Sequence, residues 1–332
     1  MKLGIIGSGK IVHEFLPQIL SVKGIEVLAL LSTARSLDKA KELGKKYGIT
    51  KVTCDEAEFF ESPIDTVYIA APNHLHFSNA KKALENGLNV IVEKPACSNI
   101  EEMKELEMLA NENGKLLLEA LSTRHFPVYE AIREALELIG SVRVVRCCYY
   151  QYSSRYDAFK QGEILPAFDP AKAGGALMDL NVYNLQFVLG FFGMPESLDY
   201  DAHIERGIDT NGTLILNYPE FSAICMAAKD CQGPSNCLIA GTDGWIETSK
   251  AANQIGQVTM HLRKDSYKPV VLGQGNEQRA IDEFEFFMKV IGANDLENGR
   301  KDQAISVMAS QIQSEARKKA GIVFPADGTD AA

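Results

Sequence analysis

The chain has 332 residues, of which 46% are hydrophobic, and a formal net charge of -10. This length predicts two domains with sizeable cores, and an acidic chain without a block of Lys or Arg is a poor partner for nucleic acid or an anionic membrane. Its longest apolar stretch is far too short to cross a bilayer, so we expect no membrane association.

The N-terminal residues predict a strand at 3–6, a glycine turn and a helix over 10–22. Because this strand begins at once, without a charged leader and a long apolar run, we expect a cytoplasmic protein. Seven cysteines without a C-x-x-C pair predict reduced thiols. His74 and His76 have no cysteine or acidic partner at metal-ligand spacing, so we expect no metal site.

Strands and helices alternate through the first third of the chain. The predicted strands cover 3–6, 26–31, 66–70, 88–92 and 115–119. The predicted helices cover 10–22, 37–47 and 78–85, and a further helix begins at Ser98 and ends before Gly114. Ser98 and Glu101 are predicted to form a capping box at the start of that helix. Strict alternation predicts right-handed βαβ units and a doubly wound parallel sheet over 1–121.

After about residue 121 the regular alternation ends. Predicted strands lie at 142–150, 212–218, 222–228, 236–240, 245–248 and 257–263, and predicted helices at 128–139, 277–291 and 301–319. Thr242-Asp243-Gly244 is a hairpin turn signal. We therefore expect 122–332 to be an α+β domain with a large open, mostly antiparallel sheet.

The turn after the first strand matches most of the G-x-G-x-x-G fingerprint of Rossmann domains. In that motif the first glycine makes the tight turn, and the second lets the backbone approach a pyrophosphate at the helix N-terminus. Val12 replaces the third glycine, whose position governs helix packing more than phosphate contact. An ordinary glycine turn is the alternative, but the place of the motif inside a βαβ unit favours dinucleotide binding. The expected cofactor contacts of this turn are Gly7, Ser8, Gly9, Lys10 and Ile11.

The residues after the second strand bear on the choice of nucleotide. An acidic residue there would hold the ribose of NAD, but the chain has Ser32, Thr33 and Arg35 and no acid. Hydroxyl groups and an arginine suit the 2′-phosphate of NADP, so NADP(H) is the expected cofactor and NAD(H) the alternative. Arg35 as a solvated loop charge is the other interpretation.

A second candidate site follows Gly174 and Gly175, which precede an apolar helix that runs to about Phe192. Asp179 and Tyr183 stand four residues apart and would share a face of that helix. A carboxylate and a phenol side by side can orient a substrate hydroxyl and relay its proton. The alternative is an aspartate favoured by the helix dipole and a tyrosine buried in the core.

Four stretches in order, GIIGSGK, AAPNHLHF, VEKPACS and GGALMDLNVY, resemble the glucose–fructose oxidoreductase/inositol dehydrogenase (Gfo/Idh/MocA) family. The resemblance covers nearly the whole chain. Tyr183 stands where many members carry histidine, and Asn181 where glycine is usual. Dihydrodiol dehydrogenase-like members and glucose–fructose oxidoreductase are similar to this chain in having the tyrosine.

The resemblance implies a dinucleotide-binding Rossmann domain in 1–121 and a substrate-binding and oligomerisation domain in 122–332. It implies a homodimer or homotetramer. It also implies that Lys94 is the catalytic lysine of the E-K-P motif and that Asp179 is the carboxylate near the substrate. The further cofactor contacts that it implies are Ala71, Pro72, Asn73, His76, Glu93 and Lys94.

Lys94 follows a predicted parallel strand, and ligands bind at the carboxyl ends of such strands. A merely polar strand end is the alternative. The leading hypothesis is an NAD(P)-dependent oxidoreductase that acts on a CH–OH group of a sugar, polyol or diol. Tyr183 or Lys94 would pass the proton, and Asp179 would orient them. The alternatives are an NAD-assisted glycoside hydrolase and a non-catalytic nicotinamide sensor. Arg155 is left open between substrate contact and subunit contact.

Overall fold

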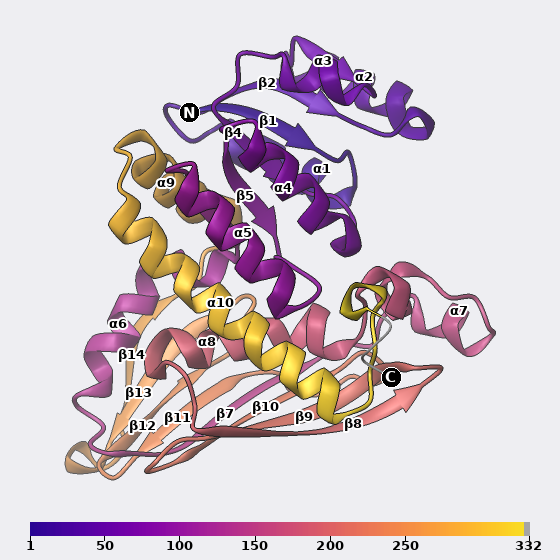
Figure 1. Cartoon of the computed structure of the whole chain (residues 1–332). Coiled ribbons are helices and arrows are strands. Elements are labelled where there is room, and N and C mark those ends of the chain that lie inside the picture. Colours follow the sequence, from indigo (N-terminus) through magenta and orange to yellow (C-terminus); the bar gives the residue numbers. More distant parts are fainter. Residues whose placement is uncertain (329–332) are drawn as a thin grey trace. The chain divides into compact units, whose positions relative to one another are not determined.

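The computed structural model describes residues 1–328, which form two compact units (Figure 1). The first unit consists of Met1–Ala120 with Ala280–Val307, and the second of Leu121–Arg279 with the residues from Met308 onward. No helix among the described residues is long and apolar enough to cross a membrane.

The first unit is built on a six-stranded parallel sheet with the strand order β3-β2-β1-β4-β5-β6. Its strands are β1 (Lys2–Ile6), β2 (Glu26–Leu31), β3 (Lys51–Thr53), β4 (Thr66–Ile69), β5 (Asn89–Glu93) and β6 (Leu117–Ala120). The connecting helices are α1 (Lys10–Ile19), α2 (Leu37–Tyr47), α3 (Glu56–Phe60), α4 (His76–Glu85) and α5 (Ile100–Glu112). The predicted doubly wound parallel sheet is confirmed, although the sequence patterns missed β3 and α3.

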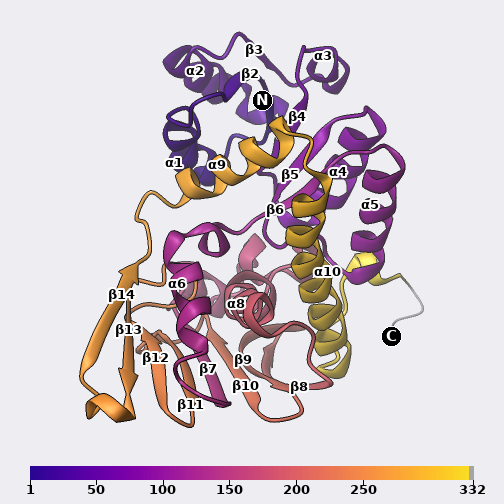
Figure 2. The ribbon, with the colours of Figure 1, turned by 90° about the vertical axis from the view of Figure 1, so that its left-hand side faces the viewer.

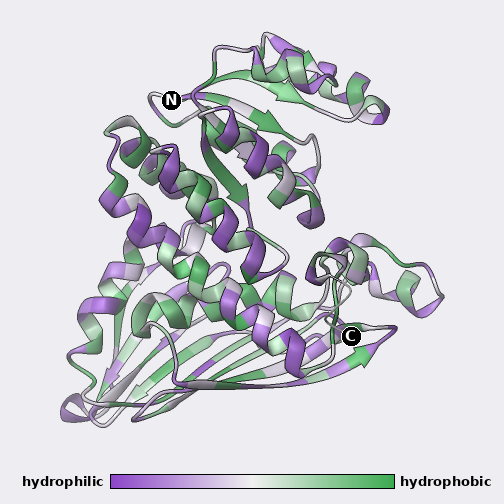
Figure 3. Cartoon of the chain, in the orientation of Figure 1, coloured by the Kyte–Doolittle hydropathy of each residue, from purple (hydrophilic) through white to green (hydrophobic). Residues whose placement is uncertain are grey.

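Central strands of this sheet are apolar along their length. Every residue of β4 is buried, and Figure 3 shows the hydrophobic colour of β5. Continuous apolar runs are typical of parallel strands that are covered on both faces. In sheets of this kind ligands bind outside the carboxyl ends of the strands.

Helix α9 (Arg279–Gly292) belongs to the first unit, whereas the division at residue 121 had placed it in the second domain. Its Phe284 and Phe287 are wholly buried in the core that also holds Tyr68 and Leu118. The rings of Tyr68 and Phe284 meet edge to face, with centroids 5.3 Å apart. The pattern of α9 shows that one face is apolar, but it does not show which core that face joins.

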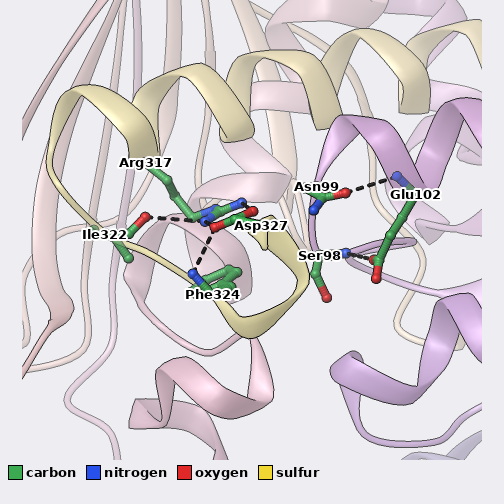
Figure 4. A network of polar contacts seen from close by, with 7 residues as sticks. All are labelled: Ser98, Asn99, Glu102, Arg317, Ile322, Phe324 and Asp327. Carbon is green, nitrogen blue, oxygen red and sulfur yellow. Dashed lines mark hydrogen bonds and ion pairs between the residues drawn. The ribbon is translucent and has the colours of Figure 1, made fainter. Parts of the chain in front are cut away.

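The predicted capping box of α5 is wrong by one residue (Figure 4). Asn99, not Ser98, is the N-cap: its side-chain oxygen accepts a hydrogen bond from the Glu102 backbone at 2.9 Å. The Glu102 carboxylate in turn accepts from the Ser98 backbone N–H at 2.9 Å. Asn99 takes the cap because its backbone is extended there, which fixes the start of the helix at Ile100.

The second unit contains an eight-stranded sheet with the order β14-β13-β12-β11-β7-β10-β9-β8. Its strands are β7 (Val142–Tyr150), β8 (Ser197–Glu205), β9 (Ile208–Asn217), β10 (Ser222–Ala228), β11 (Cys237–Gly241), β12 (Gly244–Thr248), β13 (Gln257–Leu262) and β14 (Pro269–Gln274). Neighbouring strands are antiparallel except for β7 and β10, so the predicted mostly antiparallel sheet is confirmed. The hairpin predicted at 242–244 joins β11 to β12.

Helices cover one face of this sheet. Figures 1 and 2 show α6 (Pro127–Leu136) and α8 (Val182–Phe192) lying along it, and they contact its strands. The short α7 (Tyr156–Lys160) and the second half of α10 (Leu296–Lys319) complete the unit.

A buried ion pair closes the turn after α10 (Figure 4). The Arg317 guanidinium donates to both Asp327 oxygens at 2.7 and 3.0 Å, and it also donates to the Ile322 carbonyl at 3.2 Å. Asp327 accepts a further bond from the Phe324 backbone at 2.7 Å. The C-terminal turn is therefore fixed by a charged pair whose hydrogen bonds also satisfy backbone groups.

Candidate functional site

The glycine turn of the first unit is shaped as the Rossmann motif requires. Gly7 has a φ of +113°, and a β-carbon there would collide with the Ala70 carbonyl, so only glycine fits. Gly9 has open space on the side where a side chain would stand. It is the N-cap of α1 without a side-chain cap bond, and the first turn has no acidic residue. These features leave the α1 N-terminus suited to an anionic phosphate group.

A pocket of about 460 Å³ lies at the carboxyl ends of β1, β2 and β4. Of the predicted cofactor residues, those that line it are Gly7, Ser8, Gly9, Ser32, Thr33, Ala71 and Pro72. The hydroxyl oxygens of Ser8 and Ser32 lie 2.8 Å apart, so one of them donates to the other. The other residues that line the pocket are Ile6, Leu31, Ser36, Cys54, Glu56, Ala70, Leu75 and Asn79.

Three contacts predicted in the glycine turn and in the segment after β2 are not among the residues that line this pocket. Lys10 is exposed at the start of α1, and Ile11 packs against the core of the unit. Arg35 is exposed in the single helical turn 34–36, between Thr33 and Ser36, which both line the pocket. The binding roles of Lys10, Ile11 and Arg35 stay predictions.

The sequence patterns missed two lining residues from the segment that holds β3 and α3. Cys54 is exposed, and the Glu56 carboxylate pairs with the Lys82 ammonium at 2.6 Å. Neither residue carries a motif. Because β3 has only three residues, its hydrophobic pattern is too short to predict a strand, and therefore too short to predict that the residues after it line a pocket.

His76 is wholly buried, and its two ring nitrogens each lie 2.8 Å from a carbonyl, those of Pro95 and Ala71. Burial is the main cause that lowers the pKa of His76. The imidazole therefore holds together the segments that follow β4 and β5. Asn73 is half-buried in the helical turn 73–75. The predicted cofactor contacts of His76 and Asn73 stay predictions.

The E-K-P residues end β5, which pairs with β4 in the sheet. Glu93 is the last residue of the strand, and its carboxylate accepts a hydrogen bond from the Tyr68 hydroxyl at 2.6 Å. Lys94 follows it, half-buried, and the Lys94–Pro95 peptide bond is cis. Lys94 thus stands at the carboxyl edge of the parallel sheet, as its place in the sequence predicted.

In the second unit, Asp179 lies in a π-helical segment, Leu177–Asn181, and Tyr183 in α8, which follows it directly. The predicted helix up to Phe192 is present, but its first turn is π-helical rather than α-helical. Backbone bonds in a π-turn join residues five apart, so the neighbour rule of an α-helix does not transfer unchanged. The Asp179 carboxylate accepts a bond from the Lys229 ammonium at 2.8 Å. The half-buried Tyr183 lies edge-on to Tyr149, with ring centroids 6.1 Å apart.

The π-helical segment begins on a buried carboxylate. Asp209 is 1% exposed and accepts bonds from the Leu177 backbone at 2.6 Å and the Tyr200 hydroxyl at 2.7 Å. Burial raises the pKa of Asp209 to about 6. Gly175 has a φ of +102°, and a β-carbon there would collide with Asp209. Gly175, the second glycine of the G-G-x-x-x-D stretch, therefore lets the Asp209 carboxylate approach the backbone of the segment that carries Asp179.

Lys229 and Asp209 were missed from the sequence. Lys229 follows the apolar strand β10 as Lys94 follows β5, so an isolated lysine at a strand end was the available signal. Asp209 lies inside β9 and carries no such signal. Arg155 is exposed, and its backbone N–H donates to the Ser153 hydroxyl at 3.3 Å.

The glycine turn, the pocket and the parallel sheet are those of a dinucleotide-binding protein of the Rossmann type. Family models match both parts of the chain: an oxidoreductase family with an NAD-binding Rossmann fold (GFO/IDH/MocA) over residues 1–121, and a GFO/IDH/MocA C-terminal domain over residues 129–247. The chain belongs to the Gfo/Idh/MocA oxidoreductase family, and its first unit is an NAD(P)-binding Rossmann domain.

Two curated relatives match over nearly their whole length. The scyllo-inositol 2-dehydrogenase (NADP(+)) IolU of Bacillus subtilis (strain 168) is 33% identical over 98% of this chain and 99% of its own. A trans-1,2-dihydrobenzene-1,2-diol dehydrogenase of Mus musculus is 29% identical with the same coverage. Among solved structures, KijD10, a 3-ketoreductase from Actinomadura kijaniata, superposes with a TM-score of 0.84 at 22% identity, over 96% of this chain and 97% of that one. The last match bears on the fold alone.

Proposed function

We propose that the protein oxidises or reduces a hydroxyl-bearing carbon of a sugar, a polyol or a related diol, with NADP(H) preferred to NAD(H). The observation that carries the proposal is the pocket at the carboxyl ends of β1, β2 and β4. Ser8 and Ser32 present hydroxyls there, and no acidic residue stands at the end of β2, where NAD-binding domains hold the ribose.

The relatives support the substrate class. The Bacillus subtilis relative is named for scyllo-inositol and NADP(+), and the mouse relative for a cyclic diol. Both names describe a secondary alcohol on a ring. A ring alcohol with several hydroxyl groups is therefore the first substrate class to test.

The nucleotide preference rests on the residues after β2. Thr33 and Ser36 line the pocket on either side of Arg35, whose guanidinium carries five N–H donors. A 2′-phosphate at this point would accept charge-assisted hydrogen bonds from Arg35 and neutral ones from the hydroxyls. A bare 2′-hydroxyl would gain far less from the arginine.

The nicotinamide, when bound, would supply or accept the hydride. Lys94 is proposed to donate to the substrate oxygen, and Lys94 or Tyr183 to pass the proton of the substrate hydroxyl. Asp179 is proposed to accept a hydrogen bond from that hydroxyl and so to orient it.

A turnover assay tests the proposal. The purified protein is mixed with inositols, aldoses, cyclic diols and aryl glycosides, each with NADP⁺ and with NAD⁺. Reduced nicotinamide and the released aryl alcohol are followed by their absorbance. We expect net reduction of NADP⁺ with at least one ring alcohol, and its loss in Lys94→Met. Cleavage of a glycoside without net reduced cofactor would favour the hydrolase alternative instead. Cofactor binding without turnover on any compound would favour the sensor.

A further inference from the structure

Lys229 is a buried cation held from several directions. It follows β10 and is 2% exposed. Its backbone N–H donates to the Thr210 carbonyl, and its carbonyl accepts from the Ser153 N–H, each at 2.8 Å. The side chain therefore starts from a fixed point of the backbone.

The Lys229 ammonium makes two hydrogen bonds inside the unit. It donates to the Ala167 carbonyl at 2.7 Å and to Asp179 Oδ2 at 2.8 Å, and it lies 4.9 Å from the centre of the Phe168 ring. Buried charges are costly unless they are paired and hydrogen-bonded. Asp179 supplies the countercharge in this pair.

The two partners differ sharply in exposure. The Lys229 side chain is 2% exposed, whereas the Asp179 side chain is 34% exposed. The ammonium therefore holds one carboxylate oxygen from the buried side, while about a third of the aspartate side chain is exposed.

We propose that Lys229 is a positioning residue, whose buried ammonium keeps the Asp179 carboxylate ionised and fixed in the orientation that receives a substrate hydroxyl. This inference rests on the proposed function, in which Asp179 orients the substrate. Lys229 acts through Asp179 and touches no reacting atom.

A second role has to be separated from this one. The bond from Lys229 to the Ala167 carbonyl ties down the segment that precedes Gly174, so the loss of the lysine could act through that segment alone. Asp209 also interacts electrostatically with Lys229, and it accepts hydrogen bonds from the Leu177 backbone and the Tyr200 hydroxyl. The test therefore asks whether the effect of Lys229 passes through Asp179.

A double-mutant cycle answers this question. Lys229→Met should lower kcat by about a hundredfold, because misplacing one orienting group by an ångström costs that much. When Lys229→Met is added to the Asp179→Asn variant, kcat should fall by less than a further twofold. An equal loss in both backgrounds would overturn the proposal. Lys160→Met is the matched control, because Lys160 forms an exposed ion pair with Asp157 in the same unit; it should leave kcat unchanged.

Lys229→Gln distinguishes the effect of the lysine charge from the effect of its hydrogen bond to the Ala167 carbonyl. It also replaces Lys229→Met in the cycle if Lys229→Met does not fold. Glutamine can still donate to the Ala167 carbonyl, but it carries no charge. We expect Lys229→Gln to lose as much kcat as Lys229→Met. Native kcat in Lys229→Gln would assign the lysine to the loop and overturn the proposal.

An infrared titration gives a readout that needs no substrate. The carboxyl band of Asp179 is identified as the band that Asp179→Asn removes. In Lys229→Gln the Asp179 carboxyl should take up its proton at a higher pH than in the native protein, because an opposite charge has been removed. An unchanged midpoint would overturn the proposal. If the native protein turns over no ring alcohol, the proposed function fails, and this titration alone decides the role of Lys229.

Discussion

The Ser8 and Ser32 hydroxyl oxygens lie 2.8 Å apart and join the glycine turn to the end of β2. Ser8 precedes α1, and Ser32 follows the last residue of β2, so this contact links the expected pyrophosphate end of the pocket to the ribose end. The two hydroxyl groups are neutral, so neither of them would repel an additional phosphate group at this end of the pocket.

Arg35→Ala should therefore weaken NADP(H) binding selectively. The variant loses a charge-assisted contact worth about 1.5–3 kcal/mol, which is roughly tenfold or more in affinity. NAD(H) should bind with unchanged affinity. Fluorescence titration of both cofactors measures the difference, with Arg143→Ala as a control arginine in the second unit. Equal affinities of the native protein for both nucleotides would refute the preference.

Lys94→Met keeps most of the stem volume and removes the ammonium. We expect kcat to fall by about 10²–10⁴-fold, the range of general acid–base catalysis, while cofactor affinity and thermal stability change little. Lys81→Met, which breaks an exposed ion pair with Glu105 in the same unit, should retain native kcat. Near-native turnover in Lys94→Met would reduce the E-K-P stretch to a polar strand end.

Tyr183→Phe removes a single hydroxyl group and keeps the ring that lies against Tyr149. If the phenol passes the substrate proton, kcat should fall at least tenfold with stability and cofactor affinity preserved. The half-buried Tyr47 offers a comparison, since Tyr47→Phe should have native kcat. A native rate in Tyr183→Phe would leave Lys94 as the remaining proton donor.

Asp209 should make stability depend on pH. Its pKa of about 6 in the folded protein exceeds the ordinary value of about 3.9. The folded state thus binds the proton more tightly than the unfolded state. The stability that comes from this tighter proton binding is fully present below about pH 4 and is lost as the pH rises through 6.

Asp209→Asn removes this loss. Between pH 4 and 6 its free energy of unfolding should therefore rise by on the order of 2–3 kcal/mol relative to that of the native protein. Urea unfolding followed by the fluorescence of the single tryptophan, Trp245 in β12, reports this unit; parallel pH curves for the two proteins would contradict the assignment.

Asp327→Ala should destabilise the second unit strongly. It leaves the Arg317 guanidinium, whose side chain is 3% exposed, without its carboxylate. Removing one partner of a buried pair costs about 3 kcal/mol or more. The exposed pair of Arg143 and Glu220 provides the contrast, since Glu220→Ala should change stability by less than about 1 kcal/mol. Similar losses in both variants, measured by urea unfolding, would show that burial does not strengthen the Arg317 pair.

The sequence predicted most where apolar runs and motifs coincide. Lys94 was placed correctly at the end of a parallel strand, because a strand, a charge and a proline follow one another along the chain. Lys229 occupies a similar strand end but matches no motif, and its partner Asp179 is 50 residues away. Long-range pairs of this kind depend on the topology of the sheet, which local patterns do not contain.

Two further differences from the sequence-based predictions have identifiable structural causes. Ser98 and Asn99 are both good caps, and the extended backbone at Asn99 decided between them. The π-helical segment at 177–181 depends on the buried Asp209, whose carboxylate accepts the Leu177 N–H from a distant strand. Neither outcome is visible in residue spacing.

The membership of α9 in the first unit has a consequence for how the chain is made. A ribosome releases the N-terminus first, so the six strands emerge long before Phe284 and Phe287, which complete their core. During that interval Tyr68 lacks the ring of Phe284 that packs edge to face against it in the finished protein. Exposed apolar surface of this kind promotes aggregation of nascent chains. The Rossmann unit therefore reaches its final core only after nearly all of the second unit has been synthesised.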